Sequence, residues 1–130
     1  MVDPLERPDL VGLRLELFTD DLDRLVDFYT GILGFAPVRY EPDGGYAVLV
    51  RGAVELGILV WSATGHREAA RRPPMGTEIV IEVDDIVTER DAIVEAGGRL
   101  DEDLVRRPWG LRDFRIVDPE GYYLRFTTRG

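Results

Sequence analysis

The residue types that most often carry catalysis are scarce in this chain. Its 130 residues contain no Cys, Lys, Asn or Gln, one serine, Ser62, and one histidine, His66. Thiol nucleophiles, Schiff-base lysines, zinc–thiolate sites and disulfides are thereby excluded. Ser62 and His66 lie four residues apart in a stretch rich in Gly, Ala, Thr and Arg, which is typical of a linker. We therefore do not expect them to form a nucleophile and base pair.

The chemistry that remains is that of carboxylates, guanidiniums and aromatic rings. All sixteen basic residues are arginines, and 25 acidic residues give a formal net charge of -9. This balance opposes nucleic acid and anionic membranes as partners and favours a neutral or cationic small molecule. No apolar run reaches the roughly 18 residues of a membrane span, and residues 1–10 lack a signal-peptide pattern. We therefore expect a cytoplasmic protein with one domain over residues 1–130.

An internal repeat organises the elements that must position these groups. Residues 11–35 align with residues 75–99 at a shift of 64 positions. Each copy opens with alternating apolar and polar residues, the period of a strand with one buried face. An Asp-Asp pair then caps a predicted helix, whose apolar residues recur at spacings of three and four. The strands are expected at 13–17 and 79–83, and the caps at Asp20 or Asp21 and at Asp84 or Asp85.

Three short extended runs separated by turn residues follow each helix, so each half is predicted to be βαβββ. The first half covers about 11–61 and the second about 77–128. The segment 62–76, with two prolines and two glycines, is expected to be a linker between them. The extended runs are expected at 36–41, 45–51 and 53–61, and again at 99–106, 112–118 and 122–128.

The first helix and the last hairpin carry a family resemblance. The helix reads Asp-Phe-Tyr-Thr-Gly-Ile-Leu-Gly-Phe from Asp27 to Phe35, and the hairpin combines Pro108–Arg115 with an Asp-Pro-Glu-Gly turn at 118–121. Together with the repeat, these motifs resemble the vicinal oxygen chelate superfamily (glyoxalases, bleomycin resistance proteins and extradiol dioxygenases), with the hairpin similar to the bleomycin resistance branch. The resemblance implies an α+β fold. Two tandem βαβββ modules would form a curved, partly closed mixed sheet with a helix on the outer face of each.

In that fold the concave side of each sheet lines a groove, and the period of two indicates which side chains point into it. Leu13, Leu15 and Leu17 are expected on the helix side. A solvated sheet face without a ligand is the alternative interpretation. The candidate ligand-binding residues are Arg14, Glu16, Phe18, Glu55, Trp61, Glu78, Glu82, Trp109, Tyr123 and Arg125.

Metal-dependent members of the superfamily hold their ion with four side chains, usually His, Glu, His and Glu. The resemblance maps these positions onto Arg14, Glu55, Glu78 and Arg125. A guanidinium offers no lone pair, so we expect no metal and no other cofactor. We predict instead that the four residues form a neutral ion-pair network across the groove floor, with unpaired groups at a wet surface as the alternative.

The resulting hypothesis is a metal-independent small-molecule binding protein of the glyoxalase/bleomycin resistance type. It would sequester a planar, cationic or neutral ligand, such as an antibiotic, through stacking and cation–π contacts. Two alternatives stay open: a metal-dependent lyase, isomerase or dioxygenase, which would make the protein an enzyme, and an accessory or regulatory module without a small ligand. The superfamily also implies a homodimer, in which the modules pair within one chain or exchange between two.

Overall fold

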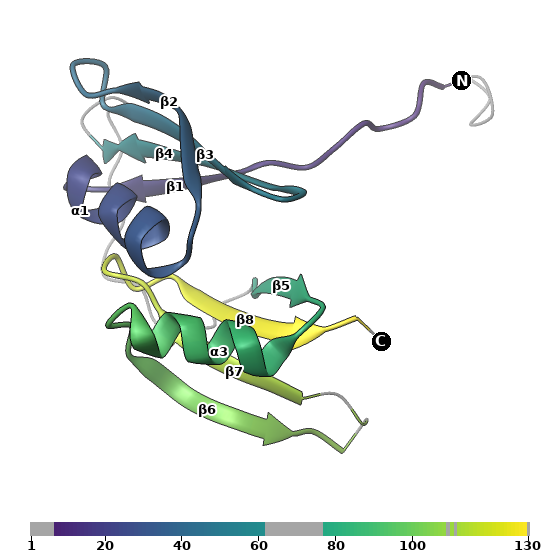
Figure 1. The fold of residues 1–130 in the computed structure, drawn as a ribbon. Helices are drawn as coiled ribbons and strands as arrows, with labels where there is room; N and C mark the ends of the chain where they lie inside the picture. Colours follow the sequence, from purple (N-terminus) through teal and green to yellow (C-terminus); the bar gives the residue numbers. More distant parts are fainter. Residues whose placement is uncertain (1–6, 62–76, 109, 111, 130) are drawn as a thin grey trace.

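The computed structural model describes residues 7–61, 77–108, 110 and 112–129. They form two modules of the same element order, strand, helix and three strands, so the predicted α+β fold is confirmed (Figure 1). The expected linker 62–76 and Trp109 lie outside the described residues. Module one contains β1 (Leu15–Thr19), α1 (Leu22–Asp27), the π-helical turn η2 (Phe28–Ile32), β2 (Ala36–Glu41), β3 (Tyr46–Arg51) and β4 (Val54–Val60). Module two contains β5 (Ile79–Val83), α3 (Ile86–Glu95), β6 (Leu100–Arg106), β7 (Arg112–Val117) and β8 (Tyr123–Thr128).

Each module forms its own four-stranded mixed sheet among the described residues. The strand orders are β1-β4-β3-β2 and β5-β8-β7-β6. In both sheets the first strand of the module pairs in parallel with the last, and the other pairs are antiparallel. Because the two sheets have the same order, a position in one sheet can be matched with a position in the other.

Short polar side chains begin both helices where the Asp-Asp pairs predict them. The Asp21 carboxylate accepts a hydrogen bond from the backbone N–H of Arg24 (3.2 Å), and Asp85 accepts one from Thr88 (3.0 Å). These bonds satisfy N–H groups that the first turn of a helix leaves without partners. Of the two candidates in each pair, the second is therefore the cap. None of the described helices is long and apolar enough to cross a membrane.

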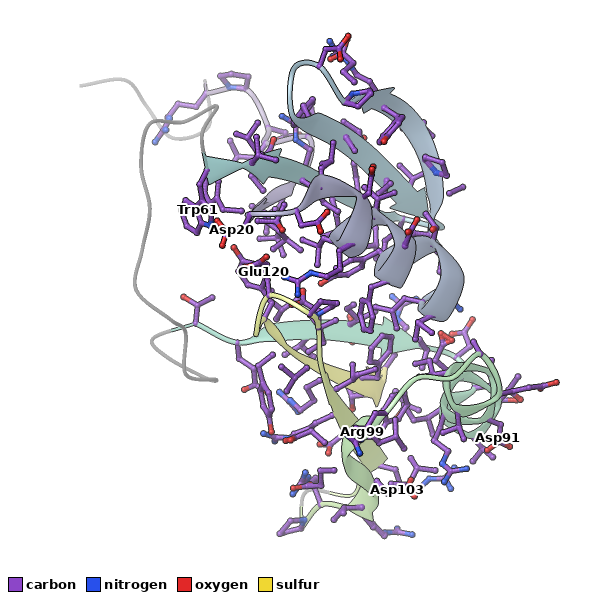
Figure 2. All side chains as sticks on the ribbon, turned by 90° about the vertical axis from the view of Figure 1, so that its left-hand side faces the viewer. Asp20, Trp61, Asp91, Arg99, Asp103 and Glu120 are labelled. Atoms are coloured by element: carbon purple, nitrogen blue, oxygen red, sulfur yellow. The ribbon has the colours of Figure 1, made fainter. Side chains whose placement is uncertain are left out.

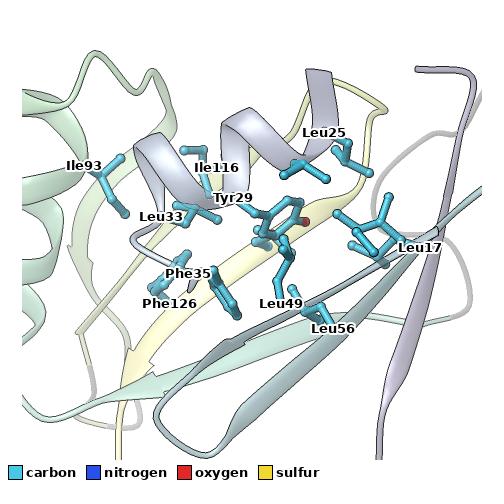
Figure 3. Packing of buried hydrophobic residues seen from close by; sticks show 14 of the residues in the cluster. Leu17, Leu25, Tyr29, Leu33, Phe35, Leu49, Leu56, Ile93, Ile116 and Phe126 are labelled. Atoms are coloured by element: carbon cyan, nitrogen blue, oxygen red, sulfur yellow. The ribbon is translucent and has the colours of Figure 1, made fainter. Parts of the chain in front are cut away.

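One apolar core joins the two modules. Figure 3 shows Tyr29, Leu33 and Phe35 of module one packed toward Phe126 of module two. Of the three leucines expected on the helix side, Leu17 is buried, Leu15 is partly buried against the core, and Leu13 is 89% exposed. It precedes β1, whose pairing with β4 begins at Leu15, so neither a strand nor a helix covers it. The buried core comprises Leu17, Leu22, Leu25, Val26, Tyr29, Leu33, Phe35, Ala47, Leu49, Leu56, Ile58, Ile86, Ile93, Phe114, Ile116, Leu124 and Phe126.

Polar contacts at two turns hold the modules together. The hydroxyl of Tyr29, in the π-helical turn η2 that continues α1, donates to Asp118 in the turn before β8 (2.7 Å). Figure 2 shows Glu120 of the same turn between the two sheets, close to module one. At the other turn, Arg51 at the end of β3 forms a two-pronged ion pair with Glu89 of α3. Each helix thus contacts the turn that precedes the last strand of the other module.

Candidate functional site

Each sheet turns one face to the shared core and leaves the other, here called its open face, without a helix. The strand registers assign the residues of both faces. The open face of module one carries Arg14, Glu16, Phe18, Arg39, Glu41, Tyr46, Val48, Val50, Glu55, Gly57 and Leu59. The open face of module two carries Glu78, Val80, Glu82, Glu102, Asp113, Arg115, Val117, Tyr123, Arg125 and Thr127.

Glu16 lies at the centre of the module-one face, across from Gly57 on β4. Its Oε1 atom accepts a hydrogen bond from the Tyr46 hydroxyl (3.3 Å) and lies 3.1 Å from Nη2 of Arg14. Its Oε2 atom is buried and has no hydrogen-bond partner within the part of the chain that the structure describes. A Cβ atom on residue 57 would lie only 1.9 Å from Oε2, so the glycine makes room for the carboxylate.

Aromatic rings lie on the same face as this carboxylate. Phe18 stacks on Trp61, with ring centroids 5.0 Å apart and an angle of 21° between the planes. Trp61 is only 7% exposed, so its ring packs against Phe18 and presents little surface to a ligand. The Arg39 guanidinium lies over the Tyr46 ring at 5.7 Å. Partial burial and the negative charge of Glu16 raise the pKa of Tyr46, which keeps its phenol protonated as a donor.

The module-two face is built from alternating charges. Nε of Arg125 donates to Glu78 (2.5 Å), and Nη1 of Arg125 lies 3.6 Å from Asp113. Arg107 contacts both Glu102 and Asp113, the latter at 2.7 Å. The Asp113 side chain is 0% exposed. Burial alone would raise the pKa of Asp113, but the hydrogen bond and charge of Arg107 outweigh it and the pKa is lowered.

The four residues expected to form one network pair within their own modules. Arg14 lies 3.8 Å from Glu55 in module one, and Arg125 binds Glu78 in module two. Among the described residues, no ion pair joins the first couple to the second. The four residues therefore form two separate pairs, Arg14 with Glu55 and Arg125 with Glu78.

The superfamily's metal ion does not fit these residues. Two of the four positions that the resemblance assigns to metal ligands, Arg14 and Arg125, carry guanidiniums, which offer no metal-binding lone pair. Within the part of the chain that the structure describes, no group of three or more His, Cys, Asp or Glu side chains could hold a metal ion.

The remaining candidates are placed less closely together. Glu82 is exposed on β5, and Tyr123 on β8 lies beneath Arg115, whose guanidinium carbon is 5.6 Å from the ring centroid. Tyr46, Asp113 and Arg115 were not among the predicted site residues. On β7 the period of two indicates the face of residues 113 and 115, because they alternate with apolar core residues, but it does not identify the side chains that they meet across the strands.

Known proteins share this fold. The family model for the Glyoxalase/Bleomycin resistance protein/Dioxygenase superfamily matches residues 13–126. A search of curated proteins gives no match. Among solved structures, TioX from Micromonospora sp. ML1 is 25% identical, with a TM-score of 0.73, and the alignment covers 91% of this chain and 98% of TioX. A glyoxalase/bleomycin resistance protein/dioxygenase from Nocardioides is 24% identical, with a TM-score of 0.72 and coverage of 95% and 84%.

A lactoylglutathione lyase from Agrobacterium tumefaciens is similar in fold to the same degree. It is 20% identical, with a TM-score of 0.72, and the alignment covers 94% of this chain and 96% of the lyase. The similar structures have different names and nearly equal TM-scores. Their similarity to this chain therefore shows a shared fold and no shared activity. The family model, which spans nearly the whole chain, decides the wider grouping: the chain belongs to the glyoxalase/bleomycin resistance protein/dioxygenase superfamily.

Proposed function

We propose that the protein binds a small organic molecule without a metal ion, in the manner of the superfamily's bleomycin resistance proteins. The binding surface is the open face of module one. The observation that carries this proposal is the Glu16 carboxylate, whose Oε2 atom lies buried above Gly57 and receives no hydrogen bond from the described residues. A buried acceptor left unpaired costs about 1–3 kcal/mol, which a donor from a ligand would recover after a small rotation of the side chain.

The surroundings of Glu16 define the ligand class. Phe18 and Tyr46 supply aromatic surface on the same face, in the row of side chains next to the Glu16 and Gly57 pair. Aromatic faces attract cations by about 0.5–2 kcal/mol per contact, and a carboxylate adds a charge-assisted hydrogen bond. A planar molecule with a cationic or N–H group, such as an antibiotic of that shape, meets both requirements.

The first experiment compares two probes that differ in charge but hardly in shape. Naphthylmethylamine is a cation at neutral pH, and naphthylmethanol is its neutral isostere. In a Trp109→Phe variant, tryptophan fluorescence comes from Trp61 alone, which stacks on Phe18. We expect the cation to bind more tightly, with a gap that shrinks as salt is added.

Two variants of equal charge change provide the control. Glu16→Gln should weaken binding of the cation about tenfold and leave the neutral isostere unchanged. Glu95→Gln, at the exposed end of α3, should leave both affinities unchanged. Equal affinities for the two probes in the parent protein, or equal losses in both variants, would contradict the proposal.

The proposal that no metal is needed has its own measurement. Elemental analysis of the purified protein should find no stoichiometric zinc, nickel, iron or manganese, and a chelator should leave its melting temperature unchanged. A bound metal would add its binding free energy to the stability of the folded protein. About one divalent metal ion per chain would refute this part of the proposal and favour the metal-dependent enzyme.

We also propose that the protein forms a homodimer. Residues 7–14 form an arm that extends away from β1 (Figure 1), and its apolar side chains Leu10, Val11 and Leu13 are almost fully exposed. Burial of this apolar surface against a second copy of the chain would stabilise a dimer. Sedimentation should give twice the 14.7 kDa of one chain, and Leu13→Asp should shift the equilibrium toward the monomer.

A further inference from the structure

On the open face of module two, no carboxylate of the described residues forms an ion pair with Arg115. Arg115 lies on β7, directly across from Arg125 on β8 and from Glu102 on β6, which is held by Arg107. Its Nη1 atom donates a long hydrogen bond to the Tyr123 hydroxyl (3.5 Å), and its guanidinium lies over that ring. Within the described residues Arg115 takes part in no ion pair.

The neighbouring carboxylates are engaged by other arginines. Asp113 is held by Arg107 and lies within reach of Arg125, Glu102 is held by Arg107, and Glu78 is held by Arg125. Each of these acids would have to give up a closer partner to reach Arg115. None of these three acids therefore pairs with Arg115, and Glu82, the fourth acid of the face, forms no ion pair with it among the described residues.

Arg115 is also incompletely hydrogen-bonded. Its Nε atom is buried and has no acceptor among the described residues. Buried donors are nearly always paired, so this N–H is a place where a water molecule or a ligand would supply the acceptor. Arg125, its neighbour across the strands, donates a hydrogen bond to Glu78 through Nε, and its Nη1 atom forms only a longer ion pair of 3.6 Å with Asp113. Like charges directly opposite each other in a sheet repel, and an anion between them relieves that repulsion.

We propose that Arg115, together with Arg125 and Tyr123, forms a subsite for the oxyanion group of a small molecule, a carboxylate or a phosphate. The planar fork of a guanidinium matches two oxygens of such a group. The subsite lies on module two and does not depend on the Glu16 face of module one. The net charge of -9 repels anions from the molecule as a whole, so an anion that binds must do so through local contacts such as these.

The test observes the arginine itself. In protein labelled with ¹⁵N-arginine, the Nε–H resonance of Arg115 is assigned by its loss in Arg115→Met, which keeps an apolar stem of similar length. Benzoate and inorganic phosphate are then titrated separately. We expect a saturable shift of the Arg115 resonance with at least one of them. Saturation with benzoate alone assigns a carboxylate ligand, and saturation with phosphate alone assigns a phosphorylated one.

A matched arginine on the same strand provides the control. Arg112 is exposed and lies on the other side of β7, because residues 113 and 115 point to the open face. Arg115→Met should weaken binding of the anion by at least about tenfold, whereas Arg112→Met should change it less than about twofold. Arg115→Lys, which keeps the charge without the fork, should retain part of the affinity.

Several outcomes would overturn the proposal. One is the absence of a saturable shift with both anions in the parent protein, a result that does not depend on whether any variant folds. Another is equal weakening by Arg112→Met and Arg115→Met, since it would indicate general attraction of anions. The proposed function fails separately: Glu16→Gln should leave anion binding unchanged, and Arg115→Met should leave the response to naphthylmethylamine unchanged.

Discussion

The two modules share one scaffold but have different chemistry on their open faces. Glu16 faces Gly57 in module one, where the matched pair in module two is Val80 and Arg125. On the third strand of each sheet, Val48 of module one corresponds to Arg115 of module two, because they pair with Gly57 and Arg125. Module one therefore presents a carboxylate among aromatic rings, and module two presents guanidiniums among carboxylates.

The core sides of the two sheets have not diverged in this way. Leu17 and Ile58 of module one match Ile81 and Phe126 of module two, and all four are apolar. These faces pack into one shared core, where a polar group without a partner would be costly. The comparison indicates that the packing constrains one side of each sheet and leaves the other free to acquire binding chemistry.

The largest expected effect comes from breaking the contact that holds the two modules together. Asp118 is buried and accepts hydrogen bonds from the Tyr29 hydroxyl (2.7 Å) and from the backbone N–H groups of Glu120 (2.8 Å) and Tyr122 (3.0 Å). Asp118→Ala leaves these donors without an acceptor and should lower the free energy of unfolding by about 3–4 kcal/mol. Denaturant unfolding measures this loss.

A second variant separates the two contributions at Asp118. Tyr29→Phe removes one donor and leaves the turn intact, so it should cost only about 1 kcal/mol. If Asp118→Ala proved no more harmful than Tyr29→Phe, the turn would be held by other contacts, and the proposed role of Asp118 would be wrong.

The next prediction sharpens the contrast between the open faces. Arg125 is 20% exposed and holds Glu78 and the fully buried Asp113, whereas Arg14 is 49% exposed and has looser partners. Arg125→Ala should cost about 2 kcal/mol, below the usual range for a broken buried pair because Arg107 still neutralises Asp113. Arg14→Ala should cost less than about 0.5 kcal/mol.

Exposed Arg129 provides the reference for both changes, because Arg129→Ala should leave the melting temperature unchanged. Replacing Arg125 and Glu78 together by apolar residues should recover part of the loss from Arg125→Ala, since no charge is then left alone. If Arg125→Ala and Arg14→Ala had equal effects, the two faces would not differ in how strongly their charges are buried.

A smaller effect distinguishes the two turns at which the modules meet. Arg51 binds Glu89, which is 6% exposed, and also donates to the Leu33 carbonyl (3.0 Å). Arg24, on the opposite side, reaches Glu120 with a single contact of 3.2 Å from a more exposed position. Arg51→Ala should therefore cost about 1–2 kcal/mol more than Arg24→Ala, allowing for the solvent around Arg51. Thermal unfolding of the two variants would contradict this if their order were reversed.

Much of the fold followed from local patterns. The repeat, the Asp caps and the turn residues predicted the two βαβββ modules, because each depends on residues close together in the chain. The predicted start of β1 at Leu13 was wrong. Leu13 fits the alternation, but a strand also needs a neighbouring strand, and the pairing of β1 with β4 begins at Leu15. That partner is 41 residues away, so local alternation does not reveal where the pairing stops.

The candidate site was less predictable for a related reason. The alternation on β1 placed Glu16 and Phe18 on the same face, where the structure has them. Which arginine meets which carboxylate depends on register between strands, so the expected network of four residues became two separate pairs. The roles of Tyr46 and Arg115 likewise depend on their neighbours in adjacent strands, and the period of two does not identify those neighbours.

The last prediction concerns pH, where two buried carboxylates should respond with opposite sign. Burial, against hydrogen bonds from Tyr29 and backbone groups, raises the pKa of Asp118 above 3.8, whereas Arg107 outweighs burial and lowers the pKa of Asp113 below 3.8. Between 3.8 and its raised pKa, Asp118 holds a proton in the folded state that the unfolded chain has released. The folded state therefore loses stability as pH rises through this window.

Asp113 behaves in the other direction. Its carboxylate stabilises the folded protein fully above pH 3.8, and this contribution is lost as pH falls through its lowered pKa. Asp113→Asn should therefore differ most from the parent protein above pH 3.8, with a gap that narrows in acid. Relative to Asp118→Asn, the parent should instead lose stability as pH rises above 3.8. Urea unfolding across the acid range measures both gaps. Parallel slopes would mean that the two carboxylates share one environment, which would contradict the ion pairing of Asp113 with Arg107.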